Sequence, residues 1–332
     1  MINVLAPQKV RDTTSQAARA LVCIDLGNGD VKAVVRMPGV DSWVPTKFAS
    51  TVCSNAASTF SVATADGKKT FSVGNDSALA DSHRTGQTKD GKVENALPLL
   101  IHAIRQTVEI KHMDKFHCDV IFTSPSNAAY RERITSELKG IHSVSVAADE
   151  TDLDNFGSEF AIDVHNVFGQ LEGLRAIHLV SEQVESEAYL IDIGHRTTLI
   201  TRVNGKGVVQ NKDRRLLDDR GVYAIAREAD RREVMAEQMC FSAQDVITAA
   251  FDRKNKKVAA TALADIVADT LGDAIAALDS DIPRFLVGGG AGLPGIDKLF
   301  KGTVIDNPQW ASLHGLASVA DKVIAHAQRR AK

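Results

Sequence analysis

The stretch CIDLGNGDVK, Cys23 to Lys32, places an aspartate inside an apolar run and follows it with two glycines. Apolar residues on both sides of Asp25 predict a strand that is buried on both faces, and the glycines predict a tight turn into a second strand. A charge in the middle of a buried strand is costly unless it is paired or solvated. At the carboxyl end of a strand, where α/β folds bind ligands, the cost is smaller. Asp25 therefore indicates a binding site at the edge of a sheet.

The same pattern returns about half a chain later. LIDIGHRTTL, Leu190 to Leu199, again has an aspartate between two isoleucines and a glycine two positions on. Asp residues often only cap turns, and one such hairpin would favour that bland interpretation. Two matched hairpins instead favour two α/β domains related by pseudo-symmetry, each contributing one acidic hairpin to a shared site.

The residue types in these hairpins suit a phosphate and a metal. Gly27 and Gly194 let the chain turn, so that backbone N–H groups come close to an anion. Asp25 and Asp192 would repel phosphates, and each is better placed to hold Mg²⁺, through water, because Mg²⁺ keeps much of its hydration shell. A third stretch, FLVGGGAGLPG from Phe285 to Gly295, is a weak signal alone but is well placed for an adenosine.

The pattern between these motifs alternates strands and helices. Apolar spacing predicts helices at Ala96–Ile110, Ala128–Gly140, Gly169–Gln183, Leu217–Met239, Ser242–Phe251, Val258–Leu278 and Ser312–Arg330. It predicts strands at Trp43–Ser50, His117–Asn127 and Glu159–Phe168, and a hairpin centred on Asp66-Gly67.

Composition is that of a folded protein with ample core. The 332 residues are 44% hydrophobic and 24% charged, and the formal charge of -3 argues against a generally basic nucleic-acid binder. The four scattered cysteines have no zinc-type spacing and are expected to be reduced core residues of a cytosolic protein. No apolar run approaches the ~20 residues that span a bilayer. The first 19 residues are polar after Leu5 and are expected to form a flexible extension and not a signal peptide, with a weak anchor in the first five residues as the alternative.

Together these motifs resemble the actin-like ATPase superfamily. DLGNGDVK is similar to its first phosphate hairpin, DIGHRTT to its second and LVGGGAGL to its adenosine loop. VIFTSPSNAAYRERITSELKG, VFGQLEGLRA and DNPQWASLHGLASVA resemble the plasmid-partition branch, the ParM/StbA family. The likeness implies a duplicated actin-like (ribonuclease H-like) α/β fold, with two lobes, a mixed sheet flanked by helices in each, and a nucleotide in the central cleft. The lobes are expected at residues 20–170, with a small insertion at about 41–115, and 171–332, with a helical subdomain at about 216–282.

The resemblance also implies roles for single residues. Asp25 and Asp192 would position Mg²⁺ and the attacking water, and Glu172, with Gln170 beside it, would orient and polarise that water. The alternative for Glu172 is an exposed acid in the first turn of a helix. Phosphate donors are implied at Gly27, Asn28, Gly29, Gly194, Thr197 and Thr198.

Other positions are less sharply defined. Lys32 would lie near the first phosphate loop or on a solvated strand face. Gly288, Gly289 and Gly290 would face the α-phosphate and ribose. Arg227 and Glu228 are the candidates for contacts from the helix that the family uses for the ribose and base. Where the family usually has a second small residue after the glycine of the second phosphate hairpin, this chain has His195-Arg196. Arg196 could reach the γ-phosphate or touch a neighbouring subunit.

By this resemblance the chain hydrolyses ATP, or GTP, and couples hydrolysis to assembly of a homopolymeric filament in the cytoplasm. The partition branch implies plasmid segregation through a separate DNA-binding adaptor, with no direct contact to nucleic acid or membrane. A chromosomal cytoskeletal protein is the first alternative. A small-molecule kinase of the same superfamily is the second, although the insertion at 41–115 looks too small and polar for a sugar pocket.

Overall fold

The computed structural model describes residues 19–53, 60–64, 67–74, 83–84, 90–108, 113–124, 128–147, 156–231, 256–293 and 295–330. They divide into two compact units. The first runs up to Glu172 and takes in Ala320–Lys332, and the second is Gly173–Val319. The sequence-based boundary lay two residues earlier, and the expected second lobe included the whole C-terminal helix.

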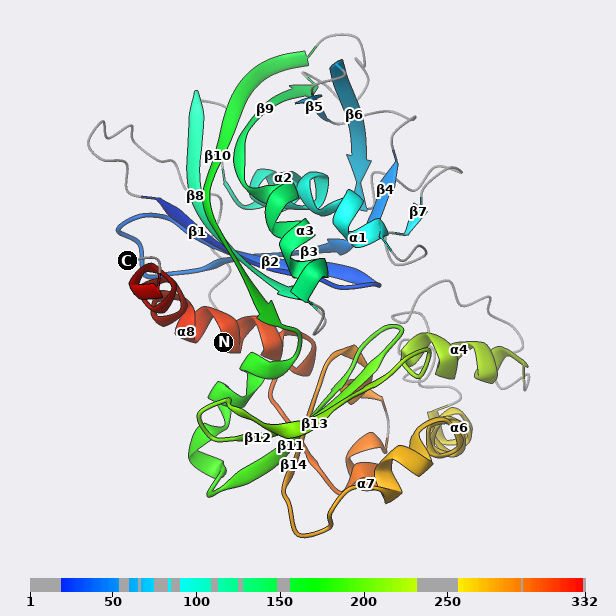
Figure 1. Cartoon of the computed structure of the whole chain (residues 1–332). Helices are drawn as coiled ribbons and strands as arrows, with labels where there is room; N and C mark the ends of the chain where they lie inside the picture. Colours follow the sequence, from blue (N-terminus) through cyan, green and yellow to red (C-terminus); the bar gives the residue numbers. More distant parts are fainter. Residues whose placement is uncertain are drawn as a thin grey trace. The chain divides into compact units, whose positions relative to one another are not determined.

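The first unit is built on one ten-stranded sheet, in the order β3-β2-β1-β8-β10-β9-β5-β6-β4-β7. Its strands are β1 (Ala20–Leu26), β2 (Asp30–Arg36), β3 (Val44–Ala49), β4 (Thr51–Cys53), β5 (Phe60–Thr64), β6 (Gly67–Val73), β7 (His83–Arg84), β8 (Lys115–Ser124), β9 (Gly140–Ala147) and β10 (Phe156–Leu171). Its helices are α1 (Gly91–Glu94), α2 (Ala96–Thr107) and α3 (Ala128–Leu138). Figure 1 shows the long strand β10 beside β8, with which it pairs in parallel.

The core of this unit lies between the sheet and α2. Most residues of α2 are buried, and Arg105 and Gln106 form its more exposed side. Alternate residues of β1, such as Val22 and Ile24, pack into this core, and the whole strand is buried. The expectation that the first hairpin strand is covered on both faces is therefore confirmed.

The second unit has a five-stranded sheet, in the order β13-β12-β11-β14-β15. Its strands are β11 (Glu187–Ile193), β12 (Thr198–Asn204), β13 (Val209–Leu217), β14 (Arg284–Val287) and β15 (Thr303–Val304). Its helices are the 3-10 segments η2 (Leu174–Leu179), η3 (Ser181–Gln183) and η4 (Gly289–Gly292), with α4 (Val222–Arg231), α6 (Lys256–Ala276), α7 (Ile296–Phe300) and the first half of α8 (Pro308–Arg330). No described helix has both the length and the apolar character needed to cross a membrane.

The two sheets repeat one plan. In each, an acidic strand pairs antiparallel with the strand that follows it and parallel with a later one: β1 with β2 and β8, and β11 with β12 and β14. A further antiparallel strand, β3 or β13, extends each sheet, and β10 and β15 are parallel additions at equivalent positions. The duplication predicted from the two aspartate motifs is thus present in the strand order.

Two local predictions were wrong, and several others fall on residues that the structure does not describe. The segment Gly169–Gln183 was expected to be a turn and an α-helix, but β10 continues to Leu171 and two 3-10 helices follow. The helix expected from Leu217 begins at Val222, because Leu217 is still paired with Thr198 in the sheet. The predicted helix Ser242–Phe251, the first 18 residues, Asp66 and Cys240 lie outside the described residues. The other three cysteines are free and buried, as expected.

Candidate functional site

A polar row crosses the first sheet near the carboxyl ends of β1, β8 and β10. Asp25 is the last residue but one of β1, and its neighbours in register are Lys32 on β2 and Thr123 on β8. Thr123 is in turn paired with Gln170 on β10. Residues that are directly opposite in a sheet point to the same face. Three of the residues that the sequence singled out, Asp25, Lys32 and Gln170, therefore lie in one line.

Asp25 is held by two donors at the centre of this row. Lys32 Nζ lies 3.0 Å from Oδ2, and the Thr123 hydroxyl donates to Oδ1 over 2.7 Å. Burial alone would raise the pKa of Asp25, but Lys32, the Thr123 hydrogen bond and Lys92 outweigh it and lower the pKa. The carboxylate is therefore ionised and fixed in orientation. Lys32 does not lie on a solvated face, because its side chain is only 12% exposed.

The turn after Asp25 is tight. A Cβ atom on Gly27 would lie 2.3 Å from the backbone oxygen of Asp30, so only glycine fits. The carbonyl of Gly29 accepts a hydrogen bond from the Ser50 amide, which ties the turn to the end of β3. Asn28, between the two glycines, is half-buried. The turn that was predicted to approach a phosphate is thus rigidly defined.

Glu172 follows directly after β10. Its amide donates to the carbonyl of Ser124 over 2.9 Å, which fixes its backbone beside the end of β8. Its side chain is half-buried, so the alternative of a fully exposed acid at a helix start does not hold. Burial, together with the charge of Glu172, raises the pKa of Tyr130 to about 12. Gln170 donates to the carbonyl of Gly169.

In the second unit, Asp192 packs between two glycines. Its register neighbours are Leu199 and Val287, so the position that Lys32 takes in the first hairpin is occupied by a leucine. A Cβ atom on Gly173 would lie 2.7 Å from one carboxylate oxygen of Asp192, and one on Gly288 would lie 2.3 Å from the other. Both glycines have positive φ, 75° and 85°. The absence of side chains at these two positions makes room for the Asp192 carboxylate.

The loop after Asp192 caps a helix. The carbonyls of Gly194, His195 and Arg196 accept hydrogen bonds from the amides of Val222, Tyr223 and Gly221, at the start of α4. These amides would otherwise lack an intrahelical partner. The buried Thr198 hydroxyl donates to the carbonyl of Arg220 over 2.7 Å. Thr198 thus joins the hairpin to the α4 turn, whereas the half-buried Thr197 accepts from Gly194 through its carbonyl.

The side chains of this loop gather at Tyr223. The guanidinium of Arg196 lies 5.9 Å from the centre of the Tyr223 ring, and the His195 ring lies 5.6 Å from it. Further along α4, Arg227 is exposed and lies 3.5 Å from the Asp219 carboxylate, and Glu228 is half-buried. Arg196 is therefore directed toward the first turn of α4.

Only one residue of the glycine triplet has open space around it. Gly288 abuts Asp192, and a Cβ atom on Gly290 would lie 2.2 Å from Ile193. A Cβ atom on Gly289 would meet only the end of the Gln309 side chain, at 3.8 Å. The amide of Gly288 donates to the carbonyl of Pro308, which joins the loop to α8. Two of the three glycines are thus required by packing on β11.

No family model and no curated protein matches the sequence. Solved structures match over nearly the whole chain. An archaeal actin homologue, Ta0583 in complex with ADP, is 18% identical with a TM-score of 0.68, and covers 91% of this chain and 99% of its own. The chain has the actin-like fold.

Two further structures with this fold belong to bacilli. Bacillus thuringiensis ParM with ATP is 13% identical with a TM-score of 0.62, and covers 95% of this chain and 100% of its own. The filament structure of AlfA from a B. subtilis plasmid is 17% identical with a TM-score of 0.57, and covers 90% and 97%. At these identities the likeness establishes the fold, in agreement with the expectation from the two hairpins.

The carboxylates of Asp25 and Asp192 are compatible with Mg²⁺ binding. Carboxylates are ligands that Mg²⁺ accepts, often through its water shell. Asp25 is ionised, and because each of its oxygens already accepts one hydrogen bond, binding through water suits it better than a direct bond. Asp192 is half-buried and has glycines on both sides. Both hairpins therefore fit a hydrated cation.

Sequence reasoning missed several residues that shape these hairpins. Thr123 holds Asp25, Gly173 makes room for Asp192, and Gly221 lets the second loop approach α4, since a Cβ atom there would lie 2.5 Å from the backbone of Arg196. The glycines just after β10 and just before α4 were visible in the sequence as turn signals. Their partners are distant along the chain, and nothing local could identify them.

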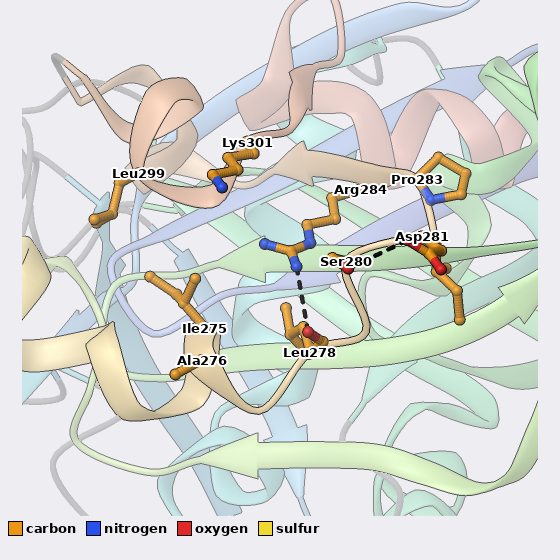
Figure 2. Close-up of a pocket in the computed structure, with 10 residues that line it drawn as sticks. Ile275, Ala276, Leu278, Ser280, Asp281, Pro283, Arg284, Leu299 and Lys301 are labelled. Carbon is orange, nitrogen blue, oxygen red and sulfur yellow. Dashed lines mark hydrogen bonds between the residues drawn. The ribbon is translucent and has the colours of Figure 1, made fainter.

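A cavity of about 430 Å³ in the second unit lies away from the hairpins. Figure 2 shows the buried Arg284 guanidinium among its lining residues, with a hydrogen bond to the carbonyl of Leu278. Arg284 also donates to the carbonyl of Asp279, just after α6, and to the carbonyl of Phe300, the last residue of α7. Its charge stabilises the ends of two helices, so this cavity is framed by a structural arginine.

Proposed function

We propose that the protein is a nucleotide-dependent, filament-forming actin-like ATPase that serves plasmid segregation. The observation that carries the proposal is the repetition of one acidic hairpin. Asp25 and Asp192 are each the last residue but one of equivalent strands, and five strands of the first sheet follow the same plan as the five strands of the second. Ligands of α/β sheets bind at the carboxyl ends of strands. The ADP and ATP complexes of Ta0583 and ParM support a nucleotide as the ligand.

The residues of the polar row have roles in this proposal, together with Asp192 and Glu172. Asp25, ionised and oriented by Lys32 and Thr123, and Asp192 hold the hydrated cation of the nucleotide. Glu172, with Gln170 beside it, accepts a hydrogen bond from the attacking water and turns that water toward the terminal phosphate. When bound, Mg²⁺ would neutralise charge on the phosphates.

The glycine turns contribute backbone donors. Phosphate contacts are assigned to the turn Gly27–Gly29 and to Gly194 with Thr197, and Gly289, the open member of the triplet, to the ribose side of the nucleotide. We assign supporting tasks to Lys32 and Thr198, because their side-chain polar atoms already form hydrogen bonds with Asp25 and with the carbonyl of Arg220. Arg196 could add positive charge near the terminal phosphate if it left the Tyr223 ring.

Filament formation is the second part of the proposal. Head-to-tail contacts between identical subunits do not close and so produce filaments. The AlfA filament supports such assembly and a plasmid setting. Because the net charge is -3, we assign DNA binding to a separate adaptor protein at a centromere-like site. A chromosomal actin-like cytoskeletal protein is the second candidate, because the similarity to the archaeal actin homologue Ta0583 supports an actin-like protein without indicating a plasmid.

Sedimentation and negative-stain microscopy, with and without Mg²⁺ and ATP or GTP, test assembly. Phosphate release measured on the same samples tests hydrolysis. We expect filaments with nucleotide only. In Glu172→Ala, filaments should remain while phosphate release falls by about 10²-fold or more, the scale of a lost general base. The exposed Glu182→Ala is the matched control. Normal hydrolysis in Glu172→Ala would show that Glu172 does not orient the attacking water. Absence of nucleotide binding in the unaltered protein would contradict the proposed function as a whole.

A second experiment tests whether both hairpins serve one nucleotide. Asp25→Asn and Asp192→Asn should each weaken binding of a fluorescent ATP analogue in the presence of Mg²⁺, by at least tenfold. The exposed Asp218→Asn should bind normally. If either hairpin variant bound the analogue as tightly as the control, a shared site would be excluded. Sequencing the neighbouring genes separates the plasmid role from the cytoskeletal one.

A further inference from the structure

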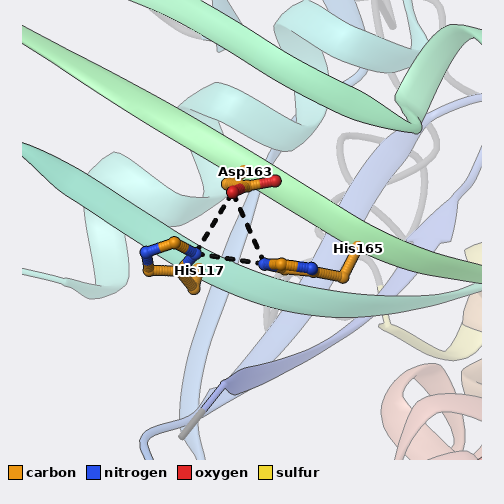
Figure 3. Close-up of side chains that lie close together, drawn as sticks. All are labelled: His117, Asp163 and His165. Carbon is orange, nitrogen blue, oxygen red and sulfur yellow. Dashed lines mark hydrogen bonds and ion pairs between the residues drawn. The ribbon is translucent and has the colours of Figure 1, made fainter. Parts of the chain in front are cut away.

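Two histidines and an aspartate meet on β8 and β10, in the first unit. Asp163 on β10 lies opposite His117 on β8, so both side chains point to the same face. The pairing of the two strands slips between Val164 and Asn166, which makes His165 the extra residue of a β-bulge. Bulges redirect side chains, and here His165 also reaches Asp163 (Figure 3).

The three side chains converge through one atom each. His117 Nδ1 lies 3.1 Å from His165 Nε2 and 3.2 Å from Asp163 Oδ2, and His165 Nε2 lies 3.5 Å from the same oxygen. In a tetrahedral zinc site with bonds of about 2.0–2.1 Å, two ligand atoms lie about 3.3–3.4 Å apart. The three atoms thus already have the spacing of one face of such a tetrahedron.

The chemistry of the cluster suits a transition metal more than Mg²⁺. Imidazole nitrogens are ligands for Zn²⁺, Co²⁺, Ni²⁺ and Cu²⁺, whereas Mg²⁺ prefers oxygen. Asp163 is largely buried at 12% side-chain exposure, and the histidines are 28% and 39% exposed. The cluster is therefore anchored in the sheet and open to solvent through its histidines.

A lysine competes for the same oxygen. Lys115 Nζ lies 2.9 Å from Asp163 Oδ2, and the Lys115 side chain is 37% exposed. Further along β8, Asp119 is engaged with Arg19 and Asn166, so it does not add to the charge available to a cation. A flexible ammonium on a metal-binding carboxylate can swing into solvent when a metal arrives. Lys115 should then weaken binding without abolishing it.

This cluster is separate from the polar row that contains Asp25. His117 is the third residue of β8, and Thr123 follows it by six residues on the same strand. At about 3.3 Å a residue, the two positions lie about 20 Å apart along the strand. A metal held here would have no part in orienting Asp25.

We propose that His117, Asp163 and His165 form a binding site for a divalent transition metal of the Zn²⁺ class, with the fourth position open to water or to an outside ligand. The proposal does not depend on nucleotide chemistry.

Titration of the full, untagged, metal-free chain with Co²⁺ tests the site, because tetrahedral Co²⁺ gives intense visible absorption bands that hydrated Co²⁺ lacks. We expect one equivalent to produce these bands and Zn²⁺ to displace them. His117→Ala, Asp163→Asn and His165→Ala should each weaken affinity at least tenfold. His326→Ala, which removes an exposed histidine of α8, should bind as the unaltered chain does.

Lys115→Gln provides a readout that a purely hydrogen-bonded cluster would not give. Removing the competing ammonium should tighten Co²⁺ binding severalfold. Circular dichroism and thermal unfolding without metal establish that each variant is folded. Failure of Co²⁺ to bind the unaltered chain, or binding that His117→Ala and His165→Ala leave unchanged, would overturn the proposal, as would weaker binding in folded Lys115→Gln.

Discussion

Lys32 and Asp25 meet across the first hairpin, with Nζ 3.0 Å from Oδ2 and 12% of each side chain exposed. The pair places a positive charge beside a buried strand-end carboxylate whose other hydrogen bond comes from the neutral Thr123 hydroxyl. The second hairpin has Leu199 at the matching position. The two hairpins therefore share a backbone plan but differ in how they hold their aspartates.

Lys32→Met should destabilise the protein by about 3–5 kcal/mol, the cost of leaving one member of a buried pair uncompensated. Lys47→Met is the matched control on the neighbouring strand, because its ion pair with Asp30 is more exposed. Such pairs contribute at most about 1 kcal/mol. Urea unfolding measures both. Equal losses of unfolding free energy in the two variants would show that the buried Lys32–Asp25 pair contributes no more than an exposed ion pair.

His102 should make stability depend on pH. Burial, with a smaller effect of Arg105, lowers the pKa of His102 to about 4, from an ordinary value of 6.5. Below pH 6.5 the unfolded chain takes up a proton that the folded chain refuses, so stability falls as the pH drops toward 4. Between pH 7 and 5 this residue should cost about 2 kcal/mol of unfolding free energy.

The variant His102→Gln isolates this effect. Its unfolding free energy in urea should change less between pH 7 and 5 than that of the unaltered protein, by about the same 2 kcal/mol. His326→Gln, on the exposed side of α8, should retain the full dependence. An unchanged pH profile in His102→Gln would mean that other groups control acid sensitivity.

The glycines beside Asp192 should not tolerate a methyl group. Gly173→Ala and Gly288→Ala each place Cβ within 2.7 Å of the carboxylate, at a positive φ that alanine disfavours. We expect losses of about 1–3 kcal/mol, together with weaker nucleotide binding. Gly292→Ala in η4 is the control, since its Cβ would meet no atom within 4 Å. Thermal unfolding and binding of an ATP analogue test both effects, and a Gly288→Ala protein as stable as the control would contradict the packing argument.

Arg284 should be essential for the second unit. Arg284→Met removes a buried cation that donates to the carbonyls of Leu278, Asp279 and Phe300. Leaving these carbonyls without their donor should cost about 3 kcal/mol or more. Arg329→Met, which alters an exposed arginine of α8, should cost little. Urea unfolding compares the two variants. Similar midpoints would show that Arg284 does not stabilise the helix ends.

The sequence predicted the parts of the fold that are local. The hairpins containing Asp25 and Asp192 are encoded by apolar runs and glycine turns, and their repetition revealed the duplicated plan. Residues Gly169–Gln183 were harder, because their apolar spacing suits a helix while pairing with β8 extends the strand. The contacts of Thr123 with Asp25 and of Gly173 with Asp192 could not be predicted, because each joins two segments that are distant along the chain, and no local pattern records such a contact.

The C-terminal helix has a consequence for dissecting the protein. Ala320–Lys332 belongs with the first unit, and Asp321 forms an ion pair with Arg36 on β2. Cutting the gene after Glu172 would therefore deprive the N-terminal fragment of its last helical turns. A circular permutant that starts at Gly173, with the present N- and C-termini joined, would instead encode the first unit as one continuous piece of polypeptide.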